Sequence, residues 1–154
     1  IVDLKEMIHD IRHAYRPVFK ERSIHVHMDI PSEPMAVSAD RNHLARVFRN
    51  LADNAVRYTP RGGEVMVCVE PGPETIRIRY KNLAEGLTEN DLPYLFERFY
   101  RGEKSRSRQH GGAGIGLAIV KELIEAHQGT VAADLQDGHL SIRLELPRAS
   151  RQKP

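Results

Sequence analysis

Apolar side chains recur every three or four residues in three long segments of the chain, which is the spacing of a helix with one buried face. This pattern predicts helices over residues 4–19, 40–58 and 116–127. Pro17 marks where the first helix is expected to stop or bend, because proline lacks the backbone N–H that a helix interior uses. Asp40 is the expected N-cap of the second helix.

Residues typical of helix ends predict one further, short helix and the C-terminal end of the third long helix. Residues 88–96 are expected to form the short helix, with Thr88 as its cap and Asp91 in its first turn. Gly129 is the stop signal of the third long helix, since glycine favours the backbone conformation that follows a helix.

Other segments alternate apolar and polar residues, which predicts half-buried strands. These segments are residues 24–30, 64–69, 75–80, 130–135 and 140–146. Residues 70–74 are expected to form one hairpin turn, and Asp137 with Gly138 a second. Cys68 lies in an alternating segment and is expected to be buried. The order of elements predicts one α+β domain over residues 1–147, a two-layer sandwich with an antiparallel-rich sheet and helices on one face.

The composition is that of an ordinary soluble domain. The 154 residues carry 23 basic and 21 acidic side chains, and the net charge of +2 creates no field that favours nucleic acid or a membrane surface. No apolar run approaches the roughly 20 residues of a membrane span. Cys68 is the only cysteine, so no disulfide forms within the chain, which fits a reducing compartment. The start at Ile1 leads us to expect a piece of a longer protein, and residues 148–154 a frayed, disordered tail.

The second helix carries a polar stripe along one border of its buried face. At 100° per residue, Asn50, Asn54 and Arg57 fall together, and Tyr58 lies where the stripe meets the core face. Carboxamide oxygens there can reach a hard divalent cation, and the guanidinium can meet phosphate oxygens. For the helix taken alone, a solvated edge with two incidental asparagines is the favoured interpretation.

Glycines alternate directly before the third helix, at Gly112, Gly114 and Gly116. Glycine lets backbone N–H groups approach an anion, and the helix N-terminus adds a positive dipole end. A flexible hinge before a buried helix is the alternative for this segment. The basic residues over 97–111 are either a solvated surface or a lid whose cations cover phosphates.

Two pairs of histidines have spacings that suggest a metal site. His25 and His27 share a strand face, and His9 and His13 are four residues apart on a helix. Neither pair has a third or fourth ligand at the spacing of a zinc site, so we expect no structural zinc.

Three of these segments together resemble the catalytic ATP-binding domain of two-component sensor histidine kinases, in the superfamily that includes gyrase B and MutL. Residues 50–60 resemble its N box, residues 96–101 its F box, and residues 112–117 its second glycine box. The resemblance extends over residues 2–147. It implies the Bergerat fold, a mixed five-stranded sheet backed by three helices, which holds ATP under a mobile lid.

The resemblance also implies roles for individual positions. Asn54 would be the principal Mg²⁺ ligand and, with Arg57, the catalytic pair; Asn50 is a second, possible Mg²⁺ ligand. The remaining ATP-binding positions are Tyr58, Asn82, Gly86, Leu87, Phe99, Arg101, Gly112, Gly114, Ile115, Gly116 and Leu117. Among these, Phe99 and Arg101 belong to the lid, and the second glycine box would hold the phosphate chain through its backbone N–H groups.

The first glycine box departs from the family pattern. Asn82 stands where the family has the Asp that accepts the adenine amino group, and Ala84 replaces a glycine. An asparagine keeps a carbonyl for that contact but loses the charge-assisted component, on the order of 1 kcal/mol. Weakened nucleotide affinity is expected, and a pseudokinase or regulatory binding module of the same fold is the alternative function. The threonine that the family often places near adenine falls at Leu140, which receives no role.

The activity implied is transfer of the γ-phosphoryl group of ATP to a histidine on a separate dimerisation domain. Asn50 occupies the position at which ATPase relatives carry a glutamate base, so hydrolysis is disfavoured. The phosphoacceptor motif is missing from this sequence, and the chain is not expected to phosphorylate itself. The implied partners are that dimerisation domain and, through the full-length kinase, a response regulator. The chain is expected to be a monomeric cytoplasmic domain of a membrane-anchored bacterial sensor, without direct contact to membrane or nucleic acid.

Overall fold

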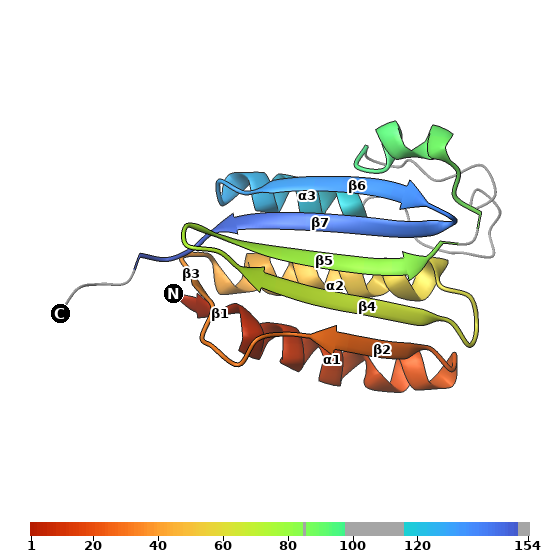
Figure 1. Cartoon of the computed structure of the whole chain (residues 1–154), viewed down its shortest axis with the longest axis horizontal. Coiled ribbons are helices and arrows are strands. Elements are labelled where there is room, and N and C mark those ends of the chain that lie inside the picture. Colours follow the sequence, from red (N-terminus) through yellow and green to blue (C-terminus); the bar gives the residue numbers. More distant parts are fainter. Residues whose placement is uncertain (85, 98–115, 151–154) are drawn as a thin grey trace.

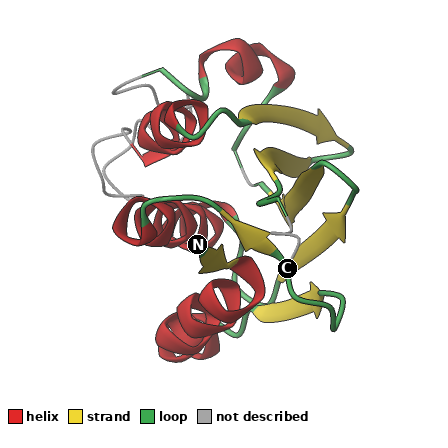
Figure 2. Ribbon diagram, turned by 90° about the vertical axis from the view of Figure 1, so that its left-hand side faces the viewer, coloured by secondary structure: helices red, strands yellow, loops and turns green. Residues whose placement is uncertain are grey.

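The computed structural model describes residues 1–84, 86–97 and 116–150. Within this part of the chain, the helices α1 (Leu4–Glu21), α2 (Arg41–Tyr58) and α3 (Gly116–Ala126) cover one face of a five-stranded sheet (Figures 1 and 2). The other face of the sheet has no helix over it in Figure 2. This is the two-layer α+β arrangement expected from the order of elements.

The strands of the larger sheet run in the order β2-β4-β5-β7-β6. Their bounds are β2 His25–Asp29, β4 Glu64–Pro71, β5 Thr75–Leu83, β6 Thr130–Gln136 and β7 His139–Pro147. β2 pairs with β4 in parallel, whereas β4–β5, β5–β7 and β6–β7 are antiparallel, so the sheet is mixed. The β6–β7 turn has positive φ at Asp137 and Gly138, as its sequence predicts.

Two short elements lie outside the larger sheet. β1 (Val2–Asp3) pairs with β3 (Ala36–Val37) in a small antiparallel sheet that the sequence did not predict, because two-residue strands carry no periodicity. The expected short helix is the 3₁₀-helix η1 (Glu89–Tyr94). Asp91 is buried there, and its Oδ2 accepts from the Thr88 backbone N–H at 2.9 Å.

We expected α1 to stop or bend near Pro17. The helix does not stop there, and it continues to Glu21. Pro17 lies on the exposed side, where water can hydrate the carbonyl that its missing N–H leaves unpaired. Phe19 is 7% exposed, and its burial holds the last turn against the core.

The expectation that Cys68 is buried is also wrong. Val65, Val67 and Val69 point into the core, so the period of two places Cys68 on the open face, where it is partly exposed. Partial burial still raises the pKa of the Cys68 thiol above its ordinary value.

The start of α2 and the end of α3 lie close to where the sequence predicts, although the residue with positive φ after α3 is Gln128, at 60°, and not Gly129. Asp40 caps α2 by accepting the His43 backbone N–H at 3.0 Å, and this bond lowers the pKa of the Asp40 carboxyl. Gly129 donates its N–H to the Ile124 oxygen at 2.9 Å, which closes the turn after α3.

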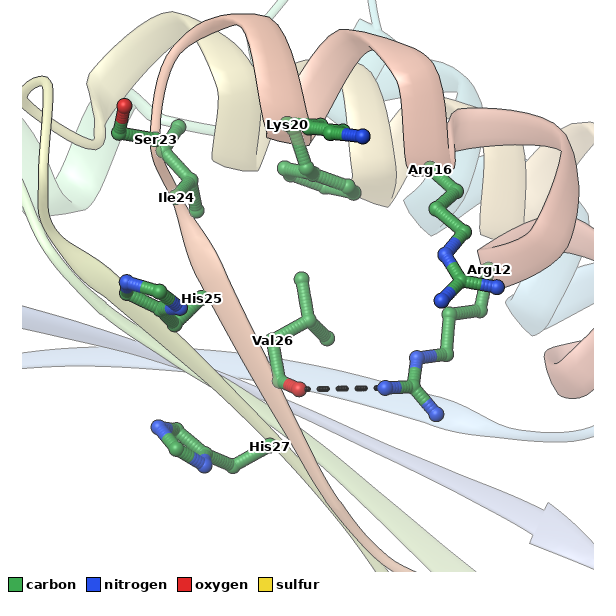
Figure 3. Close-up of a pocket in the computed structure, with 9 residues that line it drawn as sticks. Arg12, Arg16, Lys20, Ser23, Ile24, His25, Val26 and His27 are labelled. Carbon is green, nitrogen blue, oxygen red and sulfur yellow. Dashed lines mark hydrogen bonds between the residues drawn. The ribbon is translucent and has the colours of Figure 1, made fainter.

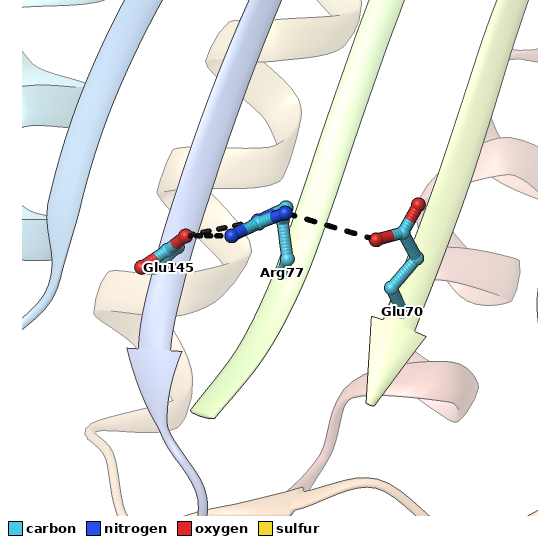
Figure 4. A network of polar contacts seen from close by, with 3 residues as sticks. All are labelled: Glu70, Arg77 and Glu145. Atoms are coloured by element: carbon cyan, nitrogen blue, oxygen red, sulfur yellow. Dashed lines mark hydrogen bonds and ion pairs between the residues drawn. The ribbon is translucent and has the colours of Figure 1, made fainter. Parts of the chain in front are cut away.

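The open face of the sheet carries an ion-pair row across three strands. Arg77 on β5 donates to Glu145 on β7 at 2.8 and 2.9 Å and lies 3.9 Å from Glu70 on β4 (Figure 4). The register places these three residues directly beside one another. Exposed ion pairs contribute little to the free energy of unfolding. We therefore infer that this row mainly helps to fix the register of the three strands.

After β7, the chain stays attached to the domain for at least two residues. The backbone N–H groups of Arg148 and Ala149 donate to the oxygens of Glu74 and Ala36 at 2.8 and 2.9 Å. Residues 151–154 of the expected tail lie outside the described residues. Across the described part of the chain, each helix is too short or too polar to cross a bilayer.

Candidate nucleotide site

The polar stripe of α2 lies at the border of the core, as the helical angles predicted. Asn54 and Tyr58 are 7% and 5% exposed, and Asn50 and Arg57 are partly exposed. Although Asn54 is nearly buried, its carboxamide is not among the fully buried side-chain groups that lack a partner in the described part of the chain. Its position on the stripe, at the border of the core, is therefore what makes it a candidate ligand.

A hydrogen bond joins this stripe to the glycine segment. Asn50 Nδ2 donates to the backbone oxygen of Gly116, at 3.3 Å, so the middle of α2 meets the first residue of α3. The first backbone N–H groups of a helix have no partner within the helix and form a positive end for an anion. Gly116 therefore lies beside Asn50, whereas the roles of Gly116 and Leu117 in holding phosphates stay predictions.

The two helices remain in contact at their other ends. His127, just after α3, accepts the backbone N–H of Asp40 through Nε2 at 3.2 Å. Its Nδ1 therefore carries the proton and donates to the Leu123 oxygen at 2.7 Å. The start of α3 thus contacts the middle of α2, and the end of α3 contacts the start of α2. The two helices are therefore antiparallel neighbours, and the two contacts hold them at a fixed spacing.

Several predicted site residues cannot be placed. Phe99, Arg101, Gly112, Gly114 and Ile115 lie outside the described residues. Their predicted roles in the lid and the second glycine box stay predictions.

The first glycine box lies at the end of β5, where Asn82 is 3% exposed. Its Nδ2 donates to the Leu83 oxygen at 3.1 Å, whereas its Oδ1 accepts no bond from a described residue. Val65 and Leu140 are its neighbours in register on the adjacent strands, so the carboxamide lies in apolar surroundings. This bond uses the donor side of the carboxamide and, as far as the described residues go, not its acceptor oxygen.

The remainder of this box turns sharply. Gly86 has a φ of +86°, a conformation that glycine adopts without strain, and Leu87 is 9% exposed. Ala84 does not have a positive φ, and its N–H donates to the Gly138 oxygen at 2.8 Å. The alanine that replaces a glycine at position 84 therefore takes a backbone conformation that an alanine adopts without strain.

Sequence reasoning missed Thr59, at the C-terminal end of α2. Its side chain is 1% exposed, and its Oγ1 has no hydrogen-bond partner within the described part of the chain. A threonine beside a predicted helix end ordinarily finds a backbone partner, so no sequence signal marks it as an unsatisfied group.

The mixed five-stranded sheet backed by helices is the fold of solved histidine-kinase catalytic domains, and here Asn50 on α2 meets the first residue of α3. Residues 39–150 match the family described as "Histidine kinase-, DNA gyrase B-, and HSP90-like ATPase". The chain belongs to this family.

Individual relatives are sensor kinases. The signal transduction histidine-protein kinase BaeS of Escherichia coli is 38% identical over 147 residues, which are 95% of this chain and 31% of that protein. The solved structure of the mycobacterial sensor histidine kinase MprB superposes with a TM-score of 0.82 at 28% identity, covering 97% of this chain and 99% of the other. The full-length ShkA structure, in complex with AMPPNP, superposes with a TM-score of 0.81 at 25% identity. The match covers 97% of this chain and 31% of the ShkA chain. The chain thus spans about a third of the length of the E. coli relative and of the ShkA chain.

Proposed function

We propose that this chain binds ATP with Mg²⁺ and donates the γ-phosphoryl group to a histidine on a separate dimerisation domain in two-component signal transduction. The observation that supports this proposal most is the Asn50–Gly116 hydrogen bond, which joins the two segments that we assign to the nucleotide site. The relative ShkA, solved with the ATP analogue AMPPNP, supports the choice of ligand.

The donor atoms suit magnesium only when phosphates accompany it. Asn54 and Asn50 offer neutral carboxamide oxygens, which are hard ligands but carry no charge. Mg²⁺ in proteins is held by carboxylates together with substrate phosphates, so here the triphosphate must supply the negative charge. We therefore infer that nucleotide and metal bind together.

The chain's own residues position and polarise the phosphates. Arg57 has no ion pair with a described carboxylate, so its guanidinium is available to phosphate oxygens. The first turn of α3, at Gly116 and Leu117, presents backbone N–H groups to the same region. Bound magnesium would neutralise charge on the transferring phosphoryl group.

Water is a poor acceptor of the phosphoryl group in this site. Asn50 has no carboxylate with which to take a proton from water, so the phosphoryl group requires a stronger nucleophile. A histidine delivered by another domain meets that need by proximity and orientation.

Buried Asn82 motivates a second candidate function, a pseudokinase or regulatory module that holds nucleotide weakly and transfers nothing. Its neutral carboxamide replaces a carboxylate at the adenine position. Its Oδ1, which accepts no bond from a described residue, favours the kinase, because an asparagine still offers adenine an acceptor.

Location and partners follow from the family. We propose that the chain is a cytoplasmic, monomeric domain of a membrane-anchored bacterial sensor, and that a response regulator receives the phosphoryl group from the full-length kinase.

The test is a transfer assay with the separately prepared dimerisation domain of its own full-length protein. With labelled ATP and Mg²⁺, acid-labile phosphohistidine should form on that domain, none on the chain alone, and none with Asn54→Ala. Nucleotide binding without transfer would select the pseudokinase function.

A further inference from the structure

Helix α1 carries a basic face that the nucleotide site does not use. Six side chains lie within about 100° of its circumference at 100° per residue: Lys5, His9, Arg12, His13, Arg16 and Lys20. The helix's acidic residues Glu6, Asp10 and Glu21 fall outside this arc. Within the described residues, no carboxylate lies at ion-pair distance from the six.

A hollow separates this basic face from strand β2. It has a volume of about 590 Å³, and Figure 3 shows Arg12, Arg16 and Lys20 on its α1 side with His25 and His27 on β2. A second hollow of about 260 Å³ continues along α1 between His9, His13 and the same two arginines. The concave surface is therefore positively charged along its length.

The hollow opens beside the free edge of the sheet. β2 is the outermost strand of its sheet in the described structure, paired with β4 alone. The His25 N–H bonds the Gly63 oxygen on the β4 side at 3.0 Å. Because backbone groups of successive strand residues point to opposite sides, those of Val26 and Met28 face the open edge.

Arg12 supports this orientation. Its Nη2 donates to the Val26 oxygen at 3.5 Å, from outside the sheet (Figure 3). A bond of that length is weak, so a strand that offers a better donor can displace it.

We propose that an extended acidic segment of a partner protein adds to the β2 edge as a further strand. Its backbone pairs with Val26 and Met28, and its alternate side chains place carboxylates against Arg12, Arg16 and Lys20. Strand addition supplies affinity through the backbone, and the charges select an acidic sequence.

The surface favours a peptide over other polyanions. A strand edge offers backbone hydrogen bonds that lipid headgroups and nucleic acid do not pair with in register. Phe19 is 7% exposed, so its ring is not available to stack on bases, and the exposed rings in the hollow are the imidazoles of His25 and His27.

The partner surface is separate from the nucleotide site. α1 and β2 lie at one edge of the molecule, whereas α3 and β6 lie at the other (Figure 1). Loss of one activity therefore leaves the other measurable.

The experiment uses a fluorescein-labelled peptide of about ten alternating Glu and Thr residues, long enough to pair with the strand. We expect saturable binding by anisotropy, amide NMR shifts at Val26 and Met28, and a loss of about tenfold or more in affinity for R12E/R16E. R41E/R46E, two exposed arginines on α2, changes the net charge equally and should bind like the wild type. A peptide with Gln in place of Glu should not bind.

Three outcomes would overturn the proposal. They are failure of the wild type to bind the acidic peptide, equal binding by R12E/R16E, and binding to anionic vesicles or an oligonucleotide in place of the peptide. R12Q/R16Q, which adds no acidic side chain, repeats the test, and thermal melting checks that both variants fold.

Discussion

Asn50 on α2 donates its amide hydrogen to the backbone oxygen of Gly116 at 3.3 Å, and 66 positions of sequence separate the two residues. The bond directs the Asn50 carboxamide toward the start of α3, so the polar stripe of one helix faces the positive end of the other. Each segment alone is compatible with an unremarkable surface. Their contact supports the proposed phosphate site.

Asn82→Asp should bind ATP more tightly than the wild type. The carboxylate restores a charge-assisted bond to the adenine amino group, about 1 kcal/mol or roughly fivefold in Kd. The free protein should become less stable, because Asp loses the bond from Asn82 Nδ2 to the Leu83 oxygen and buries a charge. Calorimetry and thermal melting measure the two effects. Unchanged or weaker ATP binding would show that Asn82 does not face adenine.

Thr59→Val should stabilise the domain by about 1 kcal/mol, because it removes a buried hydroxyl that has no partner among the described residues and keeps the shape of the side chain. Urea unfolding followed by circular dichroism gives the free energy. Thr75→Val, at an exposed position on β5, is the control and should change little. A loss of stability in Thr59→Val means that the hydroxyl has a partner after all.

Gly129→Ala should destabilise the domain by about 1–3 kcal/mol, as overpacking does. An added Cβ would collide with the Glu145 backbone oxygen and with the side chain of Ile124. Gly116→Ala is the matched control, since no described atom lies within 4 Å of its Cβ position. We expect that control to keep its stability, or gain up to about 1 kcal/mol. Equal losses in the two variants would refute the steric explanation.

Stability should fall as the pH rises above about 10, the ordinary pKa of tyrosine. Burial raises the pKa of Tyr80 well above that value, and burial followed by a hydrogen bond to Asp53 does the same for Tyr15. A pKa raised in the folded state means that unfolding releases protons at high pH, so the contribution present below pH 10 is lost above it. Tyr80→Phe should lose less stability between pH 8 and about 11 in urea titrations. An identical loss in both proteins would remove Tyr80 from the explanation.

Periodicity predicted most of the fold because most elements have one buried and one solvated face. The expectation that Cys68 is buried did not apply this rule, because Val65, Val67 and Val69 take the inward positions of β4 and alternation then places Cys68 on the open face. Pro17 was expected to end α1. The free energy lost with one exposed backbone hydrogen bond is smaller than the free energy gained by burying Phe19 in the last turn, so the helix continues. β1 and β3 are too short to carry any pattern.

The candidate site was predictable in its residue types and not in its contacts. The helical angles of Asn50 and Asn54 follow from their spacing. The bond to Gly116, the orientation of Asn82 and the unpaired hydroxyl of Thr59 depend on how distant segments pack. Local sequence contains no signal for them.

The most direct measurement is titration calorimetry of the chain with a non-hydrolysable ATP analogue. With Mg²⁺ the account predicts saturable heat for the wild type and a large loss for Asn54→Ala, whereas Mg²⁺ without nucleotide should give no binding. Absence of heat with millimolar analogue and Mg²⁺, or full binding by Asn54→Ala, would contradict a nucleotide site between α2 and α3.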